Sequence, residues 1–243
     1  AYEYLGLAYH LEGDHEHALE MYNDALKHAT KVRDLRATST ILRRRGDLYR
    51  FLGKRDKAKR DILDSALAAD RGGHLDLLWY TRVADAHFRM TIGESGAADA
   101  LQPALEYARK TGLPKLEADV IKVQAHIALS CGEAHSAYRL CIQCLGTVSR
   151  LGMGLRVTSA LVLLGQISVA LGHLSAAKGL FNAAIKQGRK QNYQSKVEQA
   201  EREKMGIISG GSLLSRKNSL SSRANSATVE IDPVRIKEMT KEE

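Results

Sequence analysis

The sequence predicts an all-α fold, a solenoid of about five helix pairs, and three observations indicate it. Small residues recur at intervals of about 40 residues through five copies. The stretches between them, such as ALEMYNDALKHA, repeat apolar residues at helical spacing. With 3 Pro, 9 Tyr, 3 Phe and 1 Trp in 243 residues, the chain has few of the residues typical of a turn-rich β-sandwich.

Three columns of small residues define the repeat. The central column is glycine: Gly13, Gly53, Gly93, Gly132 and Gly172. Five residues later comes alanine: Ala18, Ala58, Ala98, Ala137 and Ala177. Seven residues before the glycine stands another small residue: Gly6, Gly46, Ala86, Ala125 and Gly165. A larger apolar column contains Tyr22, Ile62, Cys141 and Phe181, with Gln102 as the exception. Because small side chains let helices approach closely and glycine suits a tight turn, each copy is predicted to be an antiparallel helix pair.

The segments LGLAYHLEGDHEHALEMYNDAL and LGQISVALGHLSAAKGLFNAAI carry these columns most fully. They resemble tetratricopeptide repeats, and the period near 40 is similar to the longer repeats of LGN/Pins-type and rapsyn-type scaffolds. The resemblance covers about residues 1–188. It implies a right-handed α-solenoid in which the first helix of each pair lines a concave groove, and it implies protein or peptide partners.

The repeat and the composition divide the chain into three parts. Helical repeats are expected over 1–188, at about 1–30, 31–70, 71–111, 112–150 and 151–188. Residues 189–208 are predicted to form a capping helix, because YQSKVEQAEREKM is helical in pattern but mostly polar. The Ser-rich residues 209–243 are predicted to be a disordered tail. Since Ala1 falls inside the first helix of the first repeat, we expect that the chain is a fragment or a variant missing upstream repeats.

Several classes of protein and site are not expected. The sequence has no apolar run of about 18 residues and no secretory signal pattern, and its three cysteines favour a reducing compartment, which predicts a cytoplasmic protein. Cys141 and Cys144 form a C-x-x-C motif but occupy core columns, and His15-Glu16-His17 follows a turn without further metal ligands nearby. We therefore predict no enzyme activity, no metal site and no cofactor.

A basic cluster provides the candidate binding site. Residues 42–61 contain nine Lys or Arg and three Asp, a surplus of +6 in a chain of net charge +8. The register of the resemblance places the following side chains in the groove: Arg43, Asp47, Arg50, His87, Lys122, His126 and Gln166. Because arginine can bind a carboxylate through two parallel hydrogen bonds, the expected ligand is an acidic peptide or a free C-terminus of a partner, and the chain is predicted to be a scaffold or adaptor.

Three other interpretations stay open at this point. The basic cluster could be a solvated helix face without function. The repeats could belong to a structural subunit packed permanently in a larger complex. A weaker alternative is binding of the basic patch to nucleic acid or an anionic membrane, although no nucleic-acid module or aromatic platform accompanies it.

In the tail, Ser219 and Ser226 each follow an arginine three residues earlier, a spacing that predicts phosphorylation by basophilic kinases.

Overall fold

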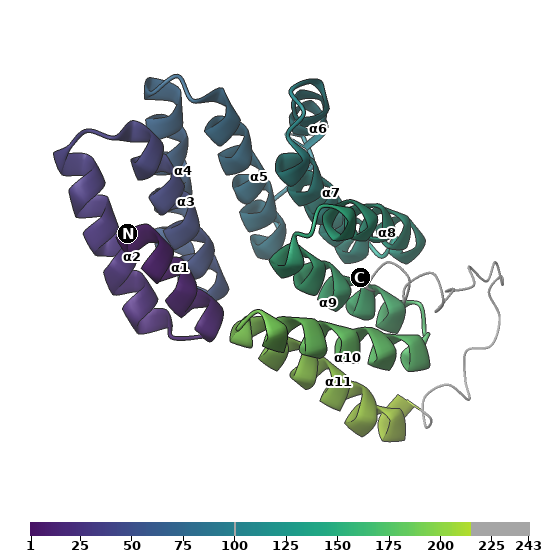
Figure 1. Cartoon of the computed structure of the whole chain (residues 1–243). Helices are drawn as coiled ribbons and strands as arrows, with labels where there is room; N and C mark the ends of the chain where they lie inside the picture. Colours follow the sequence, from purple (N-terminus) through teal and green to yellow (C-terminus); the bar gives the residue numbers. More distant parts are fainter. Residues whose placement is uncertain (100, 215–243) are drawn as a thin grey trace. The chain divides into compact units, whose positions relative to one another are not determined.

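The computed structural model describes residues 1–99 and 101–214, which contain eleven α-helices and no strand (Figure 1). Along the sequence, ten helices follow one another two by two, each two joined by a short turn: α1 (Tyr2–Glu12) and α2 (His15–Lys31), α3 (Leu35–Phe51) and α4 (Arg55–Arg71), α5 (Leu75–Ile92) and α6 (Leu101–Lys110), α7 (Pro114–Ser130) and α8 (Ala134–Arg150), and α9 (Gly154–Ala170) and α10 (Leu174–Lys190). The eleventh is α11 (Gln194–Leu214). The predicted all-α architecture of helix pairs is confirmed.

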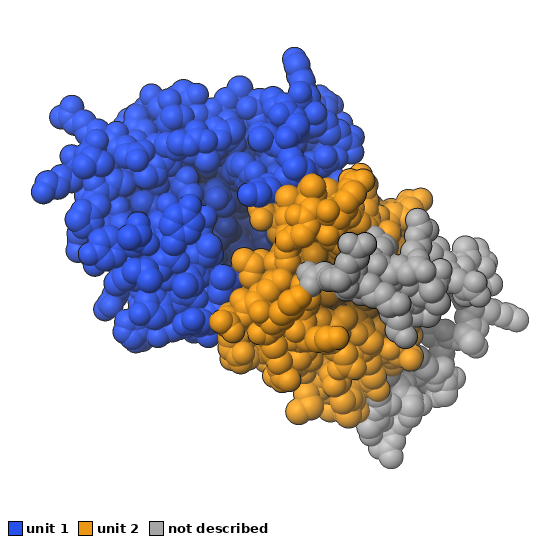
Figure 2. Space-filling view, viewed as in Figure 1, with its two compact units in different colours: residues 1–127 blue, residues 128–243 orange. Residues whose placement is uncertain are grey.

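The helices pack into two compact units, which Figure 2 colours separately. The first comprises residues 1–127 and the second begins at residue 128, so the division falls within α7. In the first unit α3 packs against α4, and α4 against α5. In the second unit α10 packs between α9 and α11. Because each helix pair covers the apolar face of its neighbour, burial in each unit comes from stacking.

The five predicted turn glycines all join the two helices of a pair. Each has a positive φ: 88° at Gly13, 70° at Gly53, 75° at Gly93, 80° at Gly132 and 79° at Gly172. Side chains with a Cβ are disfavoured in this left-handed region, which explains why glycine recurs there. The turns between successive pairs use the same conformation at positions that the sequence analysis did not single out: Arg33, Gly73, Gly112, Gly152 and Asn192.

The third repeat corrects the predicted columns. Ala98 is exposed and Ala97 is buried, and Leu101 rather than Gln102 fills the larger apolar column at 1% exposure. After Gly93, the buried positions of the third repeat therefore lie one residue earlier than in the other repeats. This shift explains why Gln102 is the exception in the larger apolar column. In the other copies the larger column is buried as predicted, at Tyr22, Ile62, Cys141 and Phe181.

Gly165 illustrates why a small residue recurs before each turn. A Cβ added there would lie 2.5 Å from the fully buried Phe181 ring, closer than side chains can pack. We expect Gly165→Ala to lower the free energy of unfolding by about 1–3 kcal/mol, because the ring must move within a filled core. Hydrogen exchange of the α9 and α10 amides measures this effect.

Gly179, on the exposed side of α10, is the matched control for Gly165. An added Cβ there meets nothing within 4 Å. We expect Gly179→Ala to raise stability by about 0.5–1 kcal/mol, because alanine restricts the unfolded chain. Equal effects of the two substitutions would contradict the packing role assigned to Gly165.

The C-terminal helix differs in its bounds from the predicted capping segment. α11 begins at Gln194, after the expected start at 189, and continues to Leu214, past the expected end at 208. It buries Val197 and Ala200 against the rest of the second unit. Most of the predicted tail, including Ser219 and Ser226, lies outside the described residues. Within the described residues, no helix is both long and apolar enough to cross a membrane.

Candidate functional site

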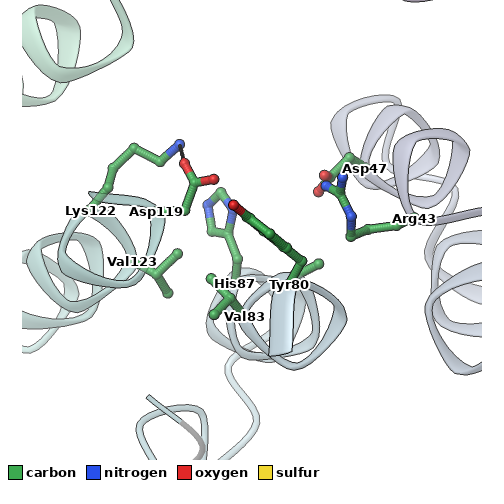
Figure 3. Close-up of a pocket in the computed structure, with 9 residues that line it drawn as sticks. Arg43, Asp47, Tyr80, Val83, His87, Asp119, Lys122 and Val123 are labelled. Carbon is green, nitrogen blue, oxygen red and sulfur yellow. Dashed lines mark ion pairs between the residues drawn. The ribbon is translucent and has the colours of Figure 1, made fainter. Parts of the chain in front are cut away.

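A pocket of about 140 Å³ opens between the first helices of three successive pairs in the first unit. It is lined by Arg43 and Asp47 from α3, Tyr80, Val83, Ala84 and His87 from α5, and Asp119, Lys122 and Val123 from α7. Figure 3 shows the Tyr80 and His87 side chains rising from α5 between the charged side chains of α3 and α7. The pocket thus joins residues that are far apart in the sequence.

Four predicted site residues line this pocket: Arg43, Asp47, His87 and Lys122. Two others lie in the first unit but outside the lining. Arg50 Nε is 3.5 Å from Asp47 Oδ1, and the His126 ring stacks on His87 with centroids 5.3 Å apart. Gln166 belongs to the second unit, where its amide donates to Glu203 Oε1 at 2.7 Å.

Tyr80 and Asp119 also line the pocket and were missed in the sequence. Tyr80 stands six residues before Ala86, and Asp119 stands six residues before Ala125. They therefore occupy the same position in their repeats. This position lies one helical turn before that of Arg43 and Lys122, which stand three residues before the small residue. Extending the groove positions by that turn would have identified both residues.

Charged and polar side chains surround an apolar base in the pocket. Val83 and Val123 are 4% and 2% exposed, and they form the base together with Ala84. The Arg43 guanidinium lies over the Tyr80 ring, 5.5 Å from its centroid, in cation–π geometry. Lys122 Nζ lies 3.7 Å from Asp119 Oδ1, a long and partly buried ion pair.

Arg43 forms no ion pair with any described residue, unlike the three other arginines that the basic cluster places on α3. Three of its neighbours do: Arg44 with Glu3 at 3.1 Å, Arg45 with Asp61 at 2.7 Å, and Arg50 with Asp47 at 3.5 Å. Lys59 in addition lies 3.8 Å from Glu94. The +6 surplus of residues 42–61 is thus partly neutralised by two carboxylates outside that segment, Glu3 and Glu94.

Arg45 has a structural role rather than a place in the pocket. Its Nε and Nη2 donate to the two carboxylate oxygens of Asp61 at 2.7 and 2.8 Å, and its Nη1 donates to Asn23 Oδ1 at 2.6 Å. The hydrogen bonds to Asp61 raise the pKa of Arg45 further. Arg45 therefore connects α2, α3 and α4.

The two motifs with possible metal chemistry have structural roles in the described chain. Asp14 caps the N-terminus of α2 by accepting a hydrogen bond from the His17 backbone N–H. The side-chain contact with Asp14, at 2.7 Å, raises the pKa of His17. Cys141 and Cys144 are buried in α8. In the part of the chain that the structure describes, no three His, Cys, Asp or Glu side chains gather in a way that could hold a metal ion.

Burial predicts how the cysteines react. It raises the pKa of the Cys141 thiol well above its usual value, with a smaller contribution from Cys144, whereas Cys131 is exposed. We expect iodoacetamide to modify Cys131 at least about 100-fold faster than Cys141 or Cys144 in the folded protein. Mass spectrometry of timed samples measures the three rates, and unfolding in urea should equalise them. Fast modification of Cys141 or Cys144 without urea would contradict a core role.

A protein-family model described as tetratricopeptide repeat matches residues 1–71. Residues 1–71 therefore contain tetratricopeptide repeats. The crystal structure of BtubC (BKLC) from P. vanneervenii is similar to the chain, with a TM-score of 0.52 and 18% sequence identity over 87% of this chain and 95% of that one. At this identity the similarity supports the fold alone. No curated protein sequence matches the chain.

Tetratricopeptide repeats generally mediate protein–protein interaction and scaffolding, and the family is typically non-catalytic. Protein partners are therefore expected for this chain. Its narrower resemblance to LGN/Pins-type and rapsyn-type scaffolds stays a prediction, as does its cytoplasmic location.

Proposed function

We propose that the chain is a non-catalytic adaptor that binds an acidic peptide segment of a partner protein in the pocket between α3, α5 and α7. The observation that supports this most is the lining of the pocket. Three successive first helices together contribute six charged or polar side chains around three apolar ones. A peptide that crosses these helices would contact all of them, whereas a small molecule would need a more enclosed cavity.

The state of Arg43 supports an acidic ligand. Its guanidinium has an aromatic neighbour but no carboxylate partner among the described residues. A ligand carboxylate would provide that partner through charge-assisted hydrogen bonds. Lys122 could bind a second acidic group, because its ion pair with Asp119 is long, at 3.7 Å. Asp47 and Asp119 would disfavour ligands that present carboxylates at other positions.

Selection from a peptide library tests the proposal. The purified chain is incubated with peptides of random sequence, and the bound peptides are sequenced. We expect enrichment of segments with Asp, Glu or a free C-terminal carboxylate, and weaker capture at high salt. Enrichment of neutral or basic segments would contradict the acidic specificity.

A structural subunit packed permanently in a complex is the second candidate, and one observation favours it. The α1 helix exposes apolar side chains, with Tyr2 at 42%, Tyr4 at 69% and Leu5 at 47% exposure. Such a surface is typical of a contact with another helix. Sedimentation distinguishes the two functions: an adaptor should be a stable monomer, whereas a subunit alone should aggregate.

Binding to nucleic acid or membrane has less support, because the basic cluster is partly neutralised.

A further inference from the structure

Two histidines stack at one side of the pocket between α3, α5 and α7. His87 on α5 lines the pocket, and the ring of His126 on α7 stacks on it, with centroids 5.3 Å apart and an angle of 27° between the planes. Both residues are half-buried, and Figure 3 shows the His87 ring rising from α5 into the pocket. A bound peptide would therefore contact His87 directly and act on both rings through its charge.

The fixed charges that line the pocket cancel. Two cations and two carboxylates reach the lining from α3 and α7: Arg43, Lys122, Asp47 and Asp119. The formal charge of the lining is therefore zero while His87 is neutral. One proton on the histidine pair makes the site positive, and because imidazole ordinarily titrates near pH 6.5, this change falls close to neutral pH. Protonation of the pair thus decides whether the pocket attracts an acidic ligand by its net charge.

The groups around the lining keep their charge between pH 6 and pH 8. Tyr80 contributes a phenol, and a phenol ordinarily keeps its proton below about pH 10. Just outside the lining, Arg50 lies 3.5 Å from Asp47 and adds one cation that does not titrate in this range. Two further ion pairs on these helices are balanced within themselves: Asp85 with Arg89 on α5 at 2.7 Å, and Glu117 on α7 with Arg109 on α6 at 2.9 Å. Of the groups named here, only the two histidines change charge over this range.

We propose that the His87–His126 pair takes up a proton when an acidic peptide binds in this pocket, so that binding becomes stronger as the pH falls from 8 to 6. The inference rests on the proposed function, because it needs a carboxylate of the peptide in the pocket. That carboxylate favours the protonated pair, and by linkage the protonated pair favours the carboxylate by the same factor. Two protons on rings 5.3 Å apart repel each other, so the pair holds one proton before it holds two.

The test measures proton uptake and affinity with the full chain and an acidic peptide selected from the library. The peptide is acetylated at its N-terminus and lacks histidine and cysteine, so its own charge stays constant between pH 6 and pH 8. Isothermal titration calorimetry at pH 7 in phosphate and in Tris, two buffers that differ in their enthalpy of ionisation, gives the number of protons taken up. Fluorescence polarisation at pH 6, 7 and 8 and constant salt gives the affinity.

Two variants assign the proton to the pair. His87→Gln/His126→Gln removes both titrating rings and keeps a polar side chain at each position. His135→Gln, at an exposed histidine of α8, is the matched control. Circular dichroism verifies that each variant is folded, and the wild-type measurements decide the proposal even if the double variant is not.

We expect the wild-type chain and His135→Gln to bind the peptide about tenfold more tightly at pH 6 than at pH 8, because an opposite charge within about 4–6 Å changes protonation by at least about that factor. Both should take up about half a proton per peptide at pH 7, which gives a tenfold change over two pH units. The double variant should change less than about twofold and take up no proton.

The outcomes separate this inference from the proposed function. Wild-type affinity that is the same at pH 6 and pH 8, no proton uptake, or an unchanged pH dependence in the folded double variant would overturn the proton coupling. If Arg43→Glu still weakened binding in that case, the proposed function would stand. Absence of peptide binding at every pH, or binding that Arg43→Glu leaves unchanged, would overturn both.

Discussion

Replacing Asp61 by alanine is expected to lower the free energy of unfolding of the first unit by about 3 kcal/mol. The Asp61 side chain is 5% exposed and that of Arg45 15%, and two hydrogen bonds join them. Removing the carboxylate leaves a guanidinium charge nearly buried without its counterion. The estimate is at the lower end for buried pairs, because Asn23 still accepts from Arg45 and the guanidinium retains some contact with water.

Urea unfolding followed by Trp79 fluorescence measures this loss, because the chain's one tryptophan lies in the first unit. The control is Asp76→Ala, which removes an ion pair of similar length, 2.6 Å to Arg36, but with side chains 30% and 55% exposed. We expect the control to cost less than about 1 kcal/mol. The double variant Arg45→Met/Asp61→Leu should recover most of the stability lost in Asp61→Ala. Equal losses for Asp61→Ala and Asp76→Ala would show that the buried pair has no special role.

The substitution Arg43→Glu is expected to weaken binding of a library-selected acidic peptide by about 10- to 100-fold. It removes the cation that has no carboxylate partner among the described residues, and it places a further negative charge beside Asp47 and Asp119 in the same pocket. Peptide affinity measured by fluorescence polarisation reports the effect. Circular dichroism should be unchanged, because Arg43 is only half-buried.

Arg139→Glu on the exposed side of α8 provides the matched control, because it changes the net charge equally. If both variants lost affinity by the same factor, the effect would come from long-range charge rather than from the pocket. Arg43→Gln should lie between wild type and Arg43→Glu, since it removes the cation without adding an anion.

The helix pairs could be predicted from the sequence because their cause is local. A glycine at a left-handed turn and small residues where helices approach closely are each visible in a single repeat, and the 40-residue period aligns them. The one-residue shift in the third repeat could not be predicted, because Ala97 and Ala98 are equally small. Packing of Leu101 into the core decides between them.

The register of the repeat predicted only some of the residues that line the candidate pocket. Arg43, Asp47, His87 and Lys122 follow from columns beside the small residue, and the structure places them around one pocket. Gln166 shares a column with Asp47 and His87, and Arg50 stands three residues after Asp47. An ion pair with Asp47 and a hydrogen bond to Glu203 hold Arg50 and Gln166, respectively, elsewhere. Such pairings depend on side-chain reach between helices, which the register does not reveal.

Photo-crosslinking of a selected acidic peptide that carries a benzophenone group tests the central claim most directly, because it locates the bound peptide. The crosslinked fragments are identified by mass spectrometry. We predict crosslinks to the pocket residues Tyr80, Val83 and Val123, and their loss in Arg43→Glu. Crosslinks confined to α9–α11 would contradict the assignment of the pocket as the peptide-binding site.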